Sequence, residues 1–181
     1  MDDIVKQAMV KWPNVPDCYG WLGLDARGNW YMRDDAAQYQ GAFNSGHPGA
    51  KGSRLQHDKL IAFIQRNYAC NAQGEWFFQN GPQRVYVELE ATPWVWRIQN
   101  DGSIQSHSGE VTPYTAALVD EFGWLYLQTA LGFGLVHTQD VAQAAQIIEE
   151  GQWSVEPVER STLPARFGYL TSPAAHHLLS K

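Results

Sequence analysis

Apolar residues recur along the chain with two spacings, one typical of helices and one typical of strands. Ile4, Val5, Ala8 and Met9 follow the helical spacing, whereas residues 84–90 alternate with the two-residue period of a strand. These spacings predict helices over residues 2–11, 53–70 and 138–151 and from residue 172 onward. Strands are predicted over residues 19–24, 29–33, 76–79, 84–90, 94–99, 103–107, 117–119, 124–128, 132–137, 152–158 and 167–170.

Residues 34–52 follow neither the helical nor the strand spacing. They are polar and rich in glycine, which predicts a long loop. The Ser-Arg-Leu-Gln sequence at residues 53–56 matches a capping box, so we expect the second helix to open there. Its apolar face would be formed by Leu60, Ile61, Ile64 and Tyr68.

A short sequence motif occurs twice in the chain. Residues 25–32 (Asp-Ala-Arg-Gly-Asn-Trp-Tyr-Met) are echoed by residues 71–78 (Asn-Ala-Gln-Gly-Glu-Trp-Phe-Phe), and a looser variant follows Asp120. Each glycine is expected to supply the positive φ that closes a hairpin. Trp30 and Trp76 each follow that glycine by two positions, which predicts that both are equivalent core anchors. We interpret the pair as an internal duplication.

Several hairpins, with a helix after each hairpin group, indicate an α+β fold. We expect a mainly antiparallel sheet built from repeated hairpin-plus-helix modules. The length fits a single domain over residues 1–181, or two sub-modules, about 1–70 and 71–181, that share a core.

Charge and composition exclude several classes of protein. The net charge is −6 and no run of five Lys or Arg residues occurs, which argues against a nucleic-acid partner. The acidic start does not fit a signal peptide, and no apolar stretch reaches the roughly 18 residues of a membrane span. With only Cys18 and Cys70, we expect two free, buried thiols in a cytoplasmic protein.

A longer stretch resembles a known kind of family. The residues Gly-Glu-Trp-Phe at 74–77, followed by residues 82–94 (Pro-Gln-Arg-Val-Tyr-Val-Glu-Leu-Glu-Ala-Thr-Pro-Trp), resemble uncharacterised proteobacterial families of the domain-of-unknown-function type, built from repeated strand-and-helix motifs. The similarity covers residues 20–170 in the order of elements. It implies a repeated-motif α+β fold and a signalling or small-molecule-sensing role, with no catalytic residues to carry over. The stretch 34–52 departs from it.

Residues 46–53 (Gly-His-Pro-Gly-Ala-Lys-Gly-Ser) are superficially similar to a phosphate-binding loop. Lys and Gly are transposed relative to that motif and no apolar strand precedes it, so nucleotide hydrolysis is rejected. A glycine loop leading into a helix can hold an anion with the help of Lys51 and Arg54. An ordinary flexible loop is the favoured interpretation.

Glu88 and Glu90 are two positions apart on one predicted strand, so their side chains would project from the same face about 6.8 Å apart. That separation suits a glycoside hydrolase, and Tyr86 could stack on a sugar. A solvated strand face explains the pair more simply. The six histidines have no zinc-ligand spacing, and no serine elbow occurs. We therefore assign no catalytic residue, no metal and no cofactor.

Aromatic residues make up 13% of the chain, with eight tryptophans. We expect Trp94, Trp96 and Trp124 to line a pocket between modules, with residues 41–54 as its lid. The leading hypothesis is a non-enzymatic binding or sensing module for an unknown small molecule or protein partner. One alternative is a carbohydrate-active hydrolase that uses Glu88 and Glu90. The other is a structural protein that forms a homodimer.

Overall fold

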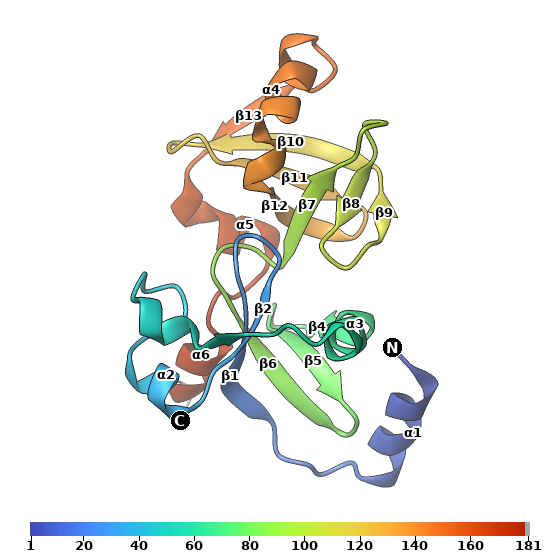
Figure 1. The fold of residues 1–181 in the computed structure, drawn as a ribbon, viewed down its shortest axis with the longest axis vertical. Helices are drawn as coiled ribbons and strands as arrows, with labels where there is room; N and C mark the ends of the chain where they lie inside the picture. The colour runs from blue at the N-terminus through green and yellow to red at the C-terminus, as the bar shows by residue number, and fades with distance from the viewer. Residues whose placement is uncertain (180–181) are drawn as a thin grey trace. The chain divides into compact units, whose positions relative to one another are not determined.

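The computed structural model describes residues 1–179 and divides them into two compact units (Figure 1). Unit 1 comprises Met1–Asp25, Asn29–Glu90 and the described residues from Tyr169 onward. Unit 2 comprises Ala26–Gly28 and Ala91–Gly168. These bounds differ from a division near residue 70, and the sharing of one core stays a prediction.

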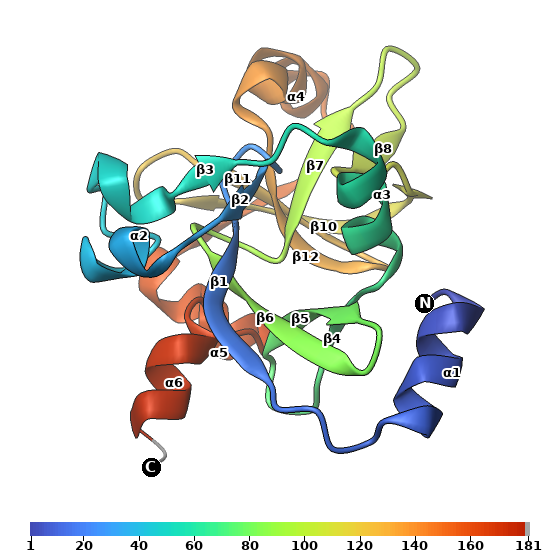
Figure 2. The same cartoon turned by 60° about the horizontal axis from the view of Figure 1, so that its bottom comes forward.

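Unit 1 combines a six-stranded sheet with helices. Its elements are α1 (Asp3–Lys11), β1 (Cys18–Leu24), β2 (Trp30–Met32), α2 (Asp35–Tyr39), the 3-10 helix η1 (Pro48–Lys51), β3 (Ser53–Arg54), α3 (Asp58–Arg66), β4 (Tyr68–Cys70), β5 (Trp76–Asn80), β6 (Gln83–Leu89) and α6 (Pro173–Leu179). The helix α3 packs against β5, and α6 packs against β6 and β1 (Figure 2). The strand order is β3-β2-β1-β6-β5-β4, and β1 and β6 run parallel.

Unit 2 contains a seven-stranded sheet of order β13-β10-β11-β12-β7-β8-β9. Its elements are β7 (Trp94–Ile98), β8 (Ile104–Ser106), β9 (Val111–Thr112), β10 (Tyr114–Asp120), β11 (Leu125–Thr129), β12 (Gly132–Val136), η2 (Thr138–Asp140), α4 (Val141–Glu149), β13 (Val155–Val158), η3 (Arg160–Thr162) and α5 (Leu163–Phe167). The pairs β12–β7 and β10–β13 are parallel. The α+β class is confirmed, but both sheets are mixed, so the expected mainly antiparallel sheet is wrong.

The two sheets share one topology. With β13 set aside, strands β7 to β12 follow the same order as strands β1 to β6, and each sheet joins its two halves through a parallel pair of first and sixth strands. The repeated strand order therefore spans six strands in each sheet. The motif copies at Asp25 and Asn71 close two different hairpins of unit 1, β1–β2 and β4–β5.

The repeated motif is a hairpin turn with a fixed set of hydrogen bonds. The N–H of Asn29 donates to Oδ1 of Asp25 at 2.8 Å. The corresponding bond to Asn71 measures 2.9 Å and that to Asp120 measures 2.8 Å. A glycine at φ +80° completes each turn, because L side chains rarely adopt that conformation; these are Gly28, Gly74 and Gly123.

Three local predictions are wrong, the first because pairing with a distant strand overrides the local signal. Ser53 and Arg54 form β3, which pairs with Met32 and Tyr31, and do not open a helix. The helix α3 begins at Asp58, where Nδ1 of His57 accepts from the N–H of Leu60 at 3.2 Å. The stretch 34–52 contains α2 and η1, and residues 167–170 continue α5 into a turn where a strand was expected.

Burial of the repeat tryptophans is unequal. Trp30 is 1% exposed, whereas Trp76 is half-buried. Both rings contact Tyr68, with centroids 5.3 Å and 4.7 Å away. The thiols are also unequal, since Cys18 is half-buried and Cys70 is exposed, and both are free. Among residues 1–179, no helix is long and apolar enough to cross a membrane.

Candidate functional site

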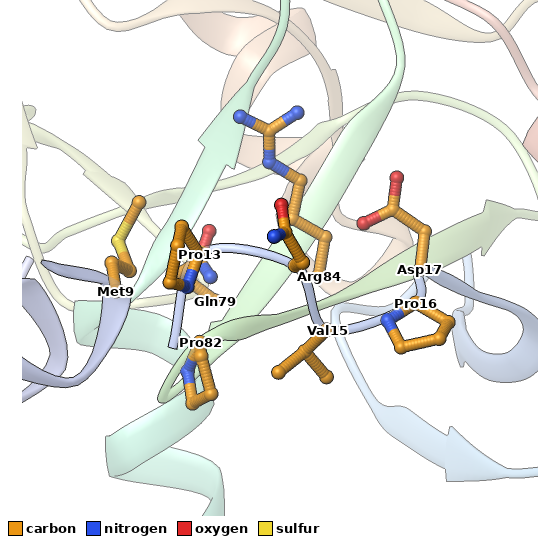
Figure 3. A pocket seen from close by; sticks show the side chains of 9 residues that line it. Met9, Pro13, Val15, Pro16, Asp17, Gln79, Pro82 and Arg84 are labelled. Atoms are coloured by element: carbon orange, nitrogen blue, oxygen red, sulfur yellow. The ribbon is translucent and has the colours of Figure 1, made fainter. Parts of the chain in front are cut away.

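A cavity of about 620 Å³ opens in unit 1 beside the start of β6 (Figure 3). Nine residues line it. They come from α1, from residues 13–17, from the end of β5 and from the turn into β6: Met9, Pro13, Asn14, Val15, Pro16, Asp17, Gln79, Pro82 and Arg84.

The walls of the cavity are stiffened by proline and joined by a hydrogen bond. Pro13 and Pro16 fix φ in the segment between α1 and β1, and Pro82 does the same in the turn between β5 and β6. The Nε2 group of Gln83 donates to the carbonyl of Pro16 at 2.9 Å, which ties the turn to the segment. The cavity is thus largely preformed.

The helix α1 is held at its N-terminus. The backbone N–H of Asp2 donates to Oδ1 of Asn67 at 2.8 Å, and the Arg66 guanidinium lies 3.1 Å from the Asp2 carboxylate. The hydrogen bond from Arg66 lowers the pKa of Asp2. These contacts keep Met9 beside the cavity.

Two opposite charges face the cavity without pairing. Arg84 lies over the ring of Phe77, 4.9 Å from its centroid, but no carboxylate among residues 1–179 forms an ion pair with it. Asp17 likewise has no hydrogen bond or ion pair within the described chain. The two side chains point the same way, with Val15 and Pro82 below them in the view (Figure 3).

Gln79 adds a buried amide to the lining. Its side chain is 1% exposed, and Nε2 donates to the carbonyl of Gly81 at 2.9 Å. Its Oε1 accepts no hydrogen bond from any residue of the described range 1–179. Buried acceptors without a donor are uncommon in folded proteins, and each calls for an explanation.

A second cavity of about 270 Å³ lies between α3 and the sheet of unit 1, and it is almost entirely apolar. Leu60, Phe63 and Ile64 cover it from the helix, and Phe78 and Val85 lie beneath. Burial raises the pKa of the Cys18 thiol at its edge, which makes that thiol a poor nucleophile at neutral pH.

The predicted carboxylate pair does not form. Glu88 is 2% exposed, and its two oxygens accept from Ser172 Oγ at 2.5 Å and from the N–H of Ala174 at 3.0 Å. Burial raises the pKa of Glu88, against the opposing effect of those hydrogen bonds and of Arg33. Glu90 instead pairs with Lys51 at 2.7 Å.

Other predicted residues of unit 1 have structural partners. Tyr86 is 3% exposed and stacks on Tyr19, with centroids 4.5 Å apart. Lys51 also lies 5.8 Å from the ring centroids of Tyr31 and Phe43. Arg54 is exposed on β3, where its backbone pairs with Tyr31. None of these residues lines the 620 Å³ cavity.

The predicted tryptophans lie in unit 2. Trp94 and Trp96 are 7% and 0% exposed and stack with centroids 5.8 Å apart. The indole N–H of Trp96 donates to the carbonyl of Leu127 at 3.0 Å. Trp124 is 38% exposed, with the guanidinium of Arg160 lying 4.1 Å from its ring centroid. Trp94 and Trp96 are therefore core residues, whereas Trp124 is partly exposed beside Arg160.

The stretch expected to act as a lid is anchored by a buried arginine. Arg33 is 3% exposed and donates to three backbone carbonyls, those of Ala50 at 2.7 Å, Gly41 at 2.6 Å and Gly20 at 3.2 Å. Two of these carbonyls belong to the 34–52 stretch. Without the Arg33 guanidinium, these carbonyls would lack this hydrogen-bond donor. Because the third carbonyl, that of Gly20, belongs to β1, Arg33 fixes this stretch to β1.

Comparison with models of protein families gives one match over most of the chain. A family model, DUF2944, with the description "Protein of unknown function (DUF2946)", matches residues 1–174. The chain belongs to this family. The match confirms the resemblance to a domain-of-unknown-function family that the sequence around residues 74–94 indicates. No curated protein matches the chain.

Two solved structures resemble this DUF2944 protein in part. One is a DUF1285 family protein from Silicibacter pomeroyi DSS-3, with 10% identity over 74% of this chain and 73% of that chain, and a TM-score of 0.48. The other is a DUF1285 family protein from Shewanella baltica OS155, with 14% identity over 70% of this chain and 91% of that chain, and a TM-score of 0.41.

Sequence reasoning missed the charged residues of the cavity in this DUF2944 protein. Asp17 lies between the predicted helix over residues 2–11 and the predicted strand over residues 19–24, and Arg84 begins a predicted strand. The only local signal is the Pro-Asn-Val-Pro-Asp run at residues 13–17, which predicts a stiff segment but names no partner for it. Among residues 1–179, no group of three or more His, Cys, Asp or Glu side chains is arranged to hold a metal ion.

Proposed function

We propose that this DUF2944 protein is a non-enzymatic small-molecule-binding module whose ligand occupies the 620 Å³ cavity of unit 1. The observation that carries the proposal is the pair of opposite charges, Arg84 and Asp17, that line one preformed cavity and have no ionic partner among residues 1–179. The volume lies in the range of small-molecule sites. The unsatisfied Oε1 of Gln79 supports the same assignment.

The composition of the lining favours binding over catalysis. It includes no Ser, Cys, Lys or His, so it offers no nucleophile paired with a base. Nor does the geometry favour the hydrolase alternative, because Glu88 is buried at the N-terminus of α6 and Glu90 pairs with Lys51. A glycosidase needs two carboxyl groups that flank one substrate bond.

The position of α1 gives the module a way to report its ligand. Met9 of α1 and residues 13–17 form one wall, and β5 and β6 supply the other. A bound ligand would contact both walls and restrain α1 against the sheet of unit 1. This restraint is the sensing step that we propose, since a ligand shifts an equilibrium only through its different affinity for two states.

The test is a thermal-shift screen of the purified protein against a metabolite panel. We expect at least one compound to raise the melting temperature, since a ligand at about 100 times its Kd stabilises by about 2.7 kcal/mol. The shift should be lost in Arg84→Met and in Asp17→Asn and kept in Arg54→Met, a matched control on the exposed strand β3. A panel without any shift, or a shift that both cavity variants retain in full, would contradict the proposal.

A further inference from the structure

The charges that face the cavity are balanced. Among its nine lining residues, Arg84 is the one cation and Asp17 the one anion. A ligand with a single kind of charge therefore meets one favourable and one unfavourable group. A ligand with one charge of each sign satisfies both.

The remaining lining combines aliphatic side chains with amides. Met9, Val15 and the three prolines present aliphatic surface, while Asn14 and Gln79 supply amides. Figure 3 shows Arg84 and Asp17 pointing the same way, with Val15 and Pro82 below them. A ligand whose aliphatic part packs on that surface would have its charged groups facing Arg84 and Asp17.

We propose that the ligand is a small zwitterion of the amino-acid class, with a carboxylate bound by Arg84, an ammonium group bound by Asp17 and an aliphatic side chain on the proline-lined wall. This inference rests on the proposed function and names its ligand. The planar guanidinium of Arg84 suits a carboxylate because two parallel N–H···O bonds can form. The Asp17 carboxylate is an acceptor for the three N–H donors of an ammonium group.

Other ligand classes fit the cavity less well. A phosphate or a dicarboxylate would place a second negative charge near Asp17, with Arg84 as the sole cation to balance it. A simple amine would meet Arg84 as a like charge. A wholly apolar ligand would remove both charges from water without pairing them, which is costly.

The cavity volume of about 620 Å³ accommodates either a free amino acid or a short peptide whose two termini carry the same groups. Both sources share the chemistry that Arg84 and Asp17 recognise. The experiment separates them with L-leucine and the dipeptide L-leucyl-L-leucine as probes.

The experiment measures affinities by isothermal titration calorimetry on the full chain. The probes are L-leucine, L-leucyl-L-leucine, N-acetyl-L-leucine, which lacks the ammonium group, L-leucine amide, which lacks the carboxylate, and inorganic phosphate. We expect leucine or leucyl-leucine to bind at least tenfold more tightly than the acetylated and amidated forms. A hydrogen bond to a charged group contributes enough for a factor of about ten to a hundred.

The variants assign each charge to its group. In Arg84→Met, leucine and leucine amide should bind with similar, weak affinity, because the carboxylate has lost its partner. In Asp17→Asn, leucine and N-acetyl-leucine should become similar instead. Arg54→Met should leave every affinity unchanged.

Four outcomes would overturn the inference. Equal binding of N-acetyl-leucine and leucine to the parent protein would show a carboxylate site, and tight binding of phosphate would show an anion site. In both cases the proposed binding function would stand and only the ligand class would fall. If none of these probes binds while another compound of the panel shifts the melting temperature through Arg84, the ligand class falls alone; if nothing binds, both proposals fall.

Discussion

Glu88 lies near the C-terminal end of β6, which pairs with β1 and β5, and the residues of this end are buried whichever face they occupy. Its neighbours Val87 and Leu89 are 0% exposed. Alternation along the strand predicts a solvated face for Glu88, but that face meets the N-terminus of α6. The carboxylate accepts from Ser172 and from the N–H of Ala174, as a residue placed at a helix N-terminus is expected to do. Those partners are far away in sequence, so no local pattern predicts them.

The raised pKa of Glu88 has a consequence for stability. The folded protein keeps the proton to a higher pH than the unfolded chain does, for which the ordinary value is 4.5. As the pH rises above about 4.5, the unfolded chain releases this proton first, so the folded state loses stability relative to it. The loss stops once the pH passes the raised value. A slope of up to about 1.4 kcal/mol per pH unit is the upper limit for one group.

We predict that the unfolding free energy of the parent protein, minus that of Glu88→Gln, falls as the pH rises from 4 to 7. Glutamine keeps the shape of the side chain but does not titrate. Urea denaturation at pH 4, 5, 6 and 7 measures the difference. Glu90→Gln is the control, since Glu90 is only half-buried beside Lys51. A difference that is flat or increases with pH would show that burial does not dominate at Glu88.

At the scale of elements, the hairpin turns were predictable and the partners of the strands were not. The turn at Asp25 is specified by residues at most four positions apart, so a short motif contains all its information. The parallel pair β1–β6 joins Leu24 to Leu89, and no periodicity reports such a contact. The same reason explains why residues 53–54 became a strand, and why Asp17 and Arg84 were not recognised as one site.

The turn glycines offer a matched pair for testing the motif. Gly28 and Gly123 both have φ +80°, so alanine at either position should cost about 1–2 kcal/mol from backbone strain. A Cβ on Gly28 would also lie 2.6 Å from Cβ of His107, whereas one on Gly123 would meet nothing within 4 Å. We predict that Gly28→Ala destabilises more than Gly123→Ala by at least about 1 kcal/mol. Equal midpoints in urea would contradict this.

Arg33 provides a test of how the 34–52 stretch is held. Arg33→Met keeps most of the volume but removes the donors to the carbonyls of Gly20, Gly41 and Ala50. We predict a loss of about 2–4 kcal/mol in unfolding free energy, since buried groups without partners cost about 1–3 kcal/mol each and part of the backbone can relax.

Hydrogen exchange read by mass spectrometry gives the local readout for Arg33→Met. Amides of α2 and η1 should exchange faster in the variant than in the parent protein under the same native conditions. Arg54→Met is the control, because Arg54 is an exposed arginine on β3 of the same unit. Unchanged protection over residues 34–52 would mean that other contacts hold this stretch.

At the scale of the whole molecule, the repeated strand order involves more chain than the sequence motif suggests. The motif copies at residues 25–32 and 71–78 belong to two hairpins of one sheet, while the corresponding strands of the second sheet keep only the turn chemistry. The turn between β7 and β8 has the same backbone hydrogen bonds. The N–H of Gln99 donates to the carbonyl of Ser103, and the N–H of Gly102 donates to the carbonyl of Gln99, at 2.9 Å each. Side chains diverge once packing differs, but the turns persist because the backbone geometry requires them.

The chain enters unit 2 at Ala91 and leaves it at Gly168, so almost all of this unit is one continuous segment. Its buried centre, including Trp96, Leu127 and Ala144, comes from within that segment. Unit 1, in contrast, needs the segment from Thr171 into α6. The N–H of Leu89 donates to the carbonyl of Thr171, and the Glu88 carboxylate accepts from Ser172 and from Ala174 of α6. A fragment that ends at residue 90 would lack these partners.

We therefore predict that a fragment of residues 91–168 folds by itself and unfolds in one cooperative transition, although it lacks the tip Ala26–Gly28. A segment of this size can bury enough apolar surface to be stable. Near-UV circular dichroism, dispersed amide signals in NMR and a sigmoidal melting curve would show the fold. Trp96→Ala in the fragment is the control, because loss of a fully buried indole costs about 3–5 kcal/mol and should abolish the transition. A fragment without tertiary signals would instead favour one core shared by the whole chain.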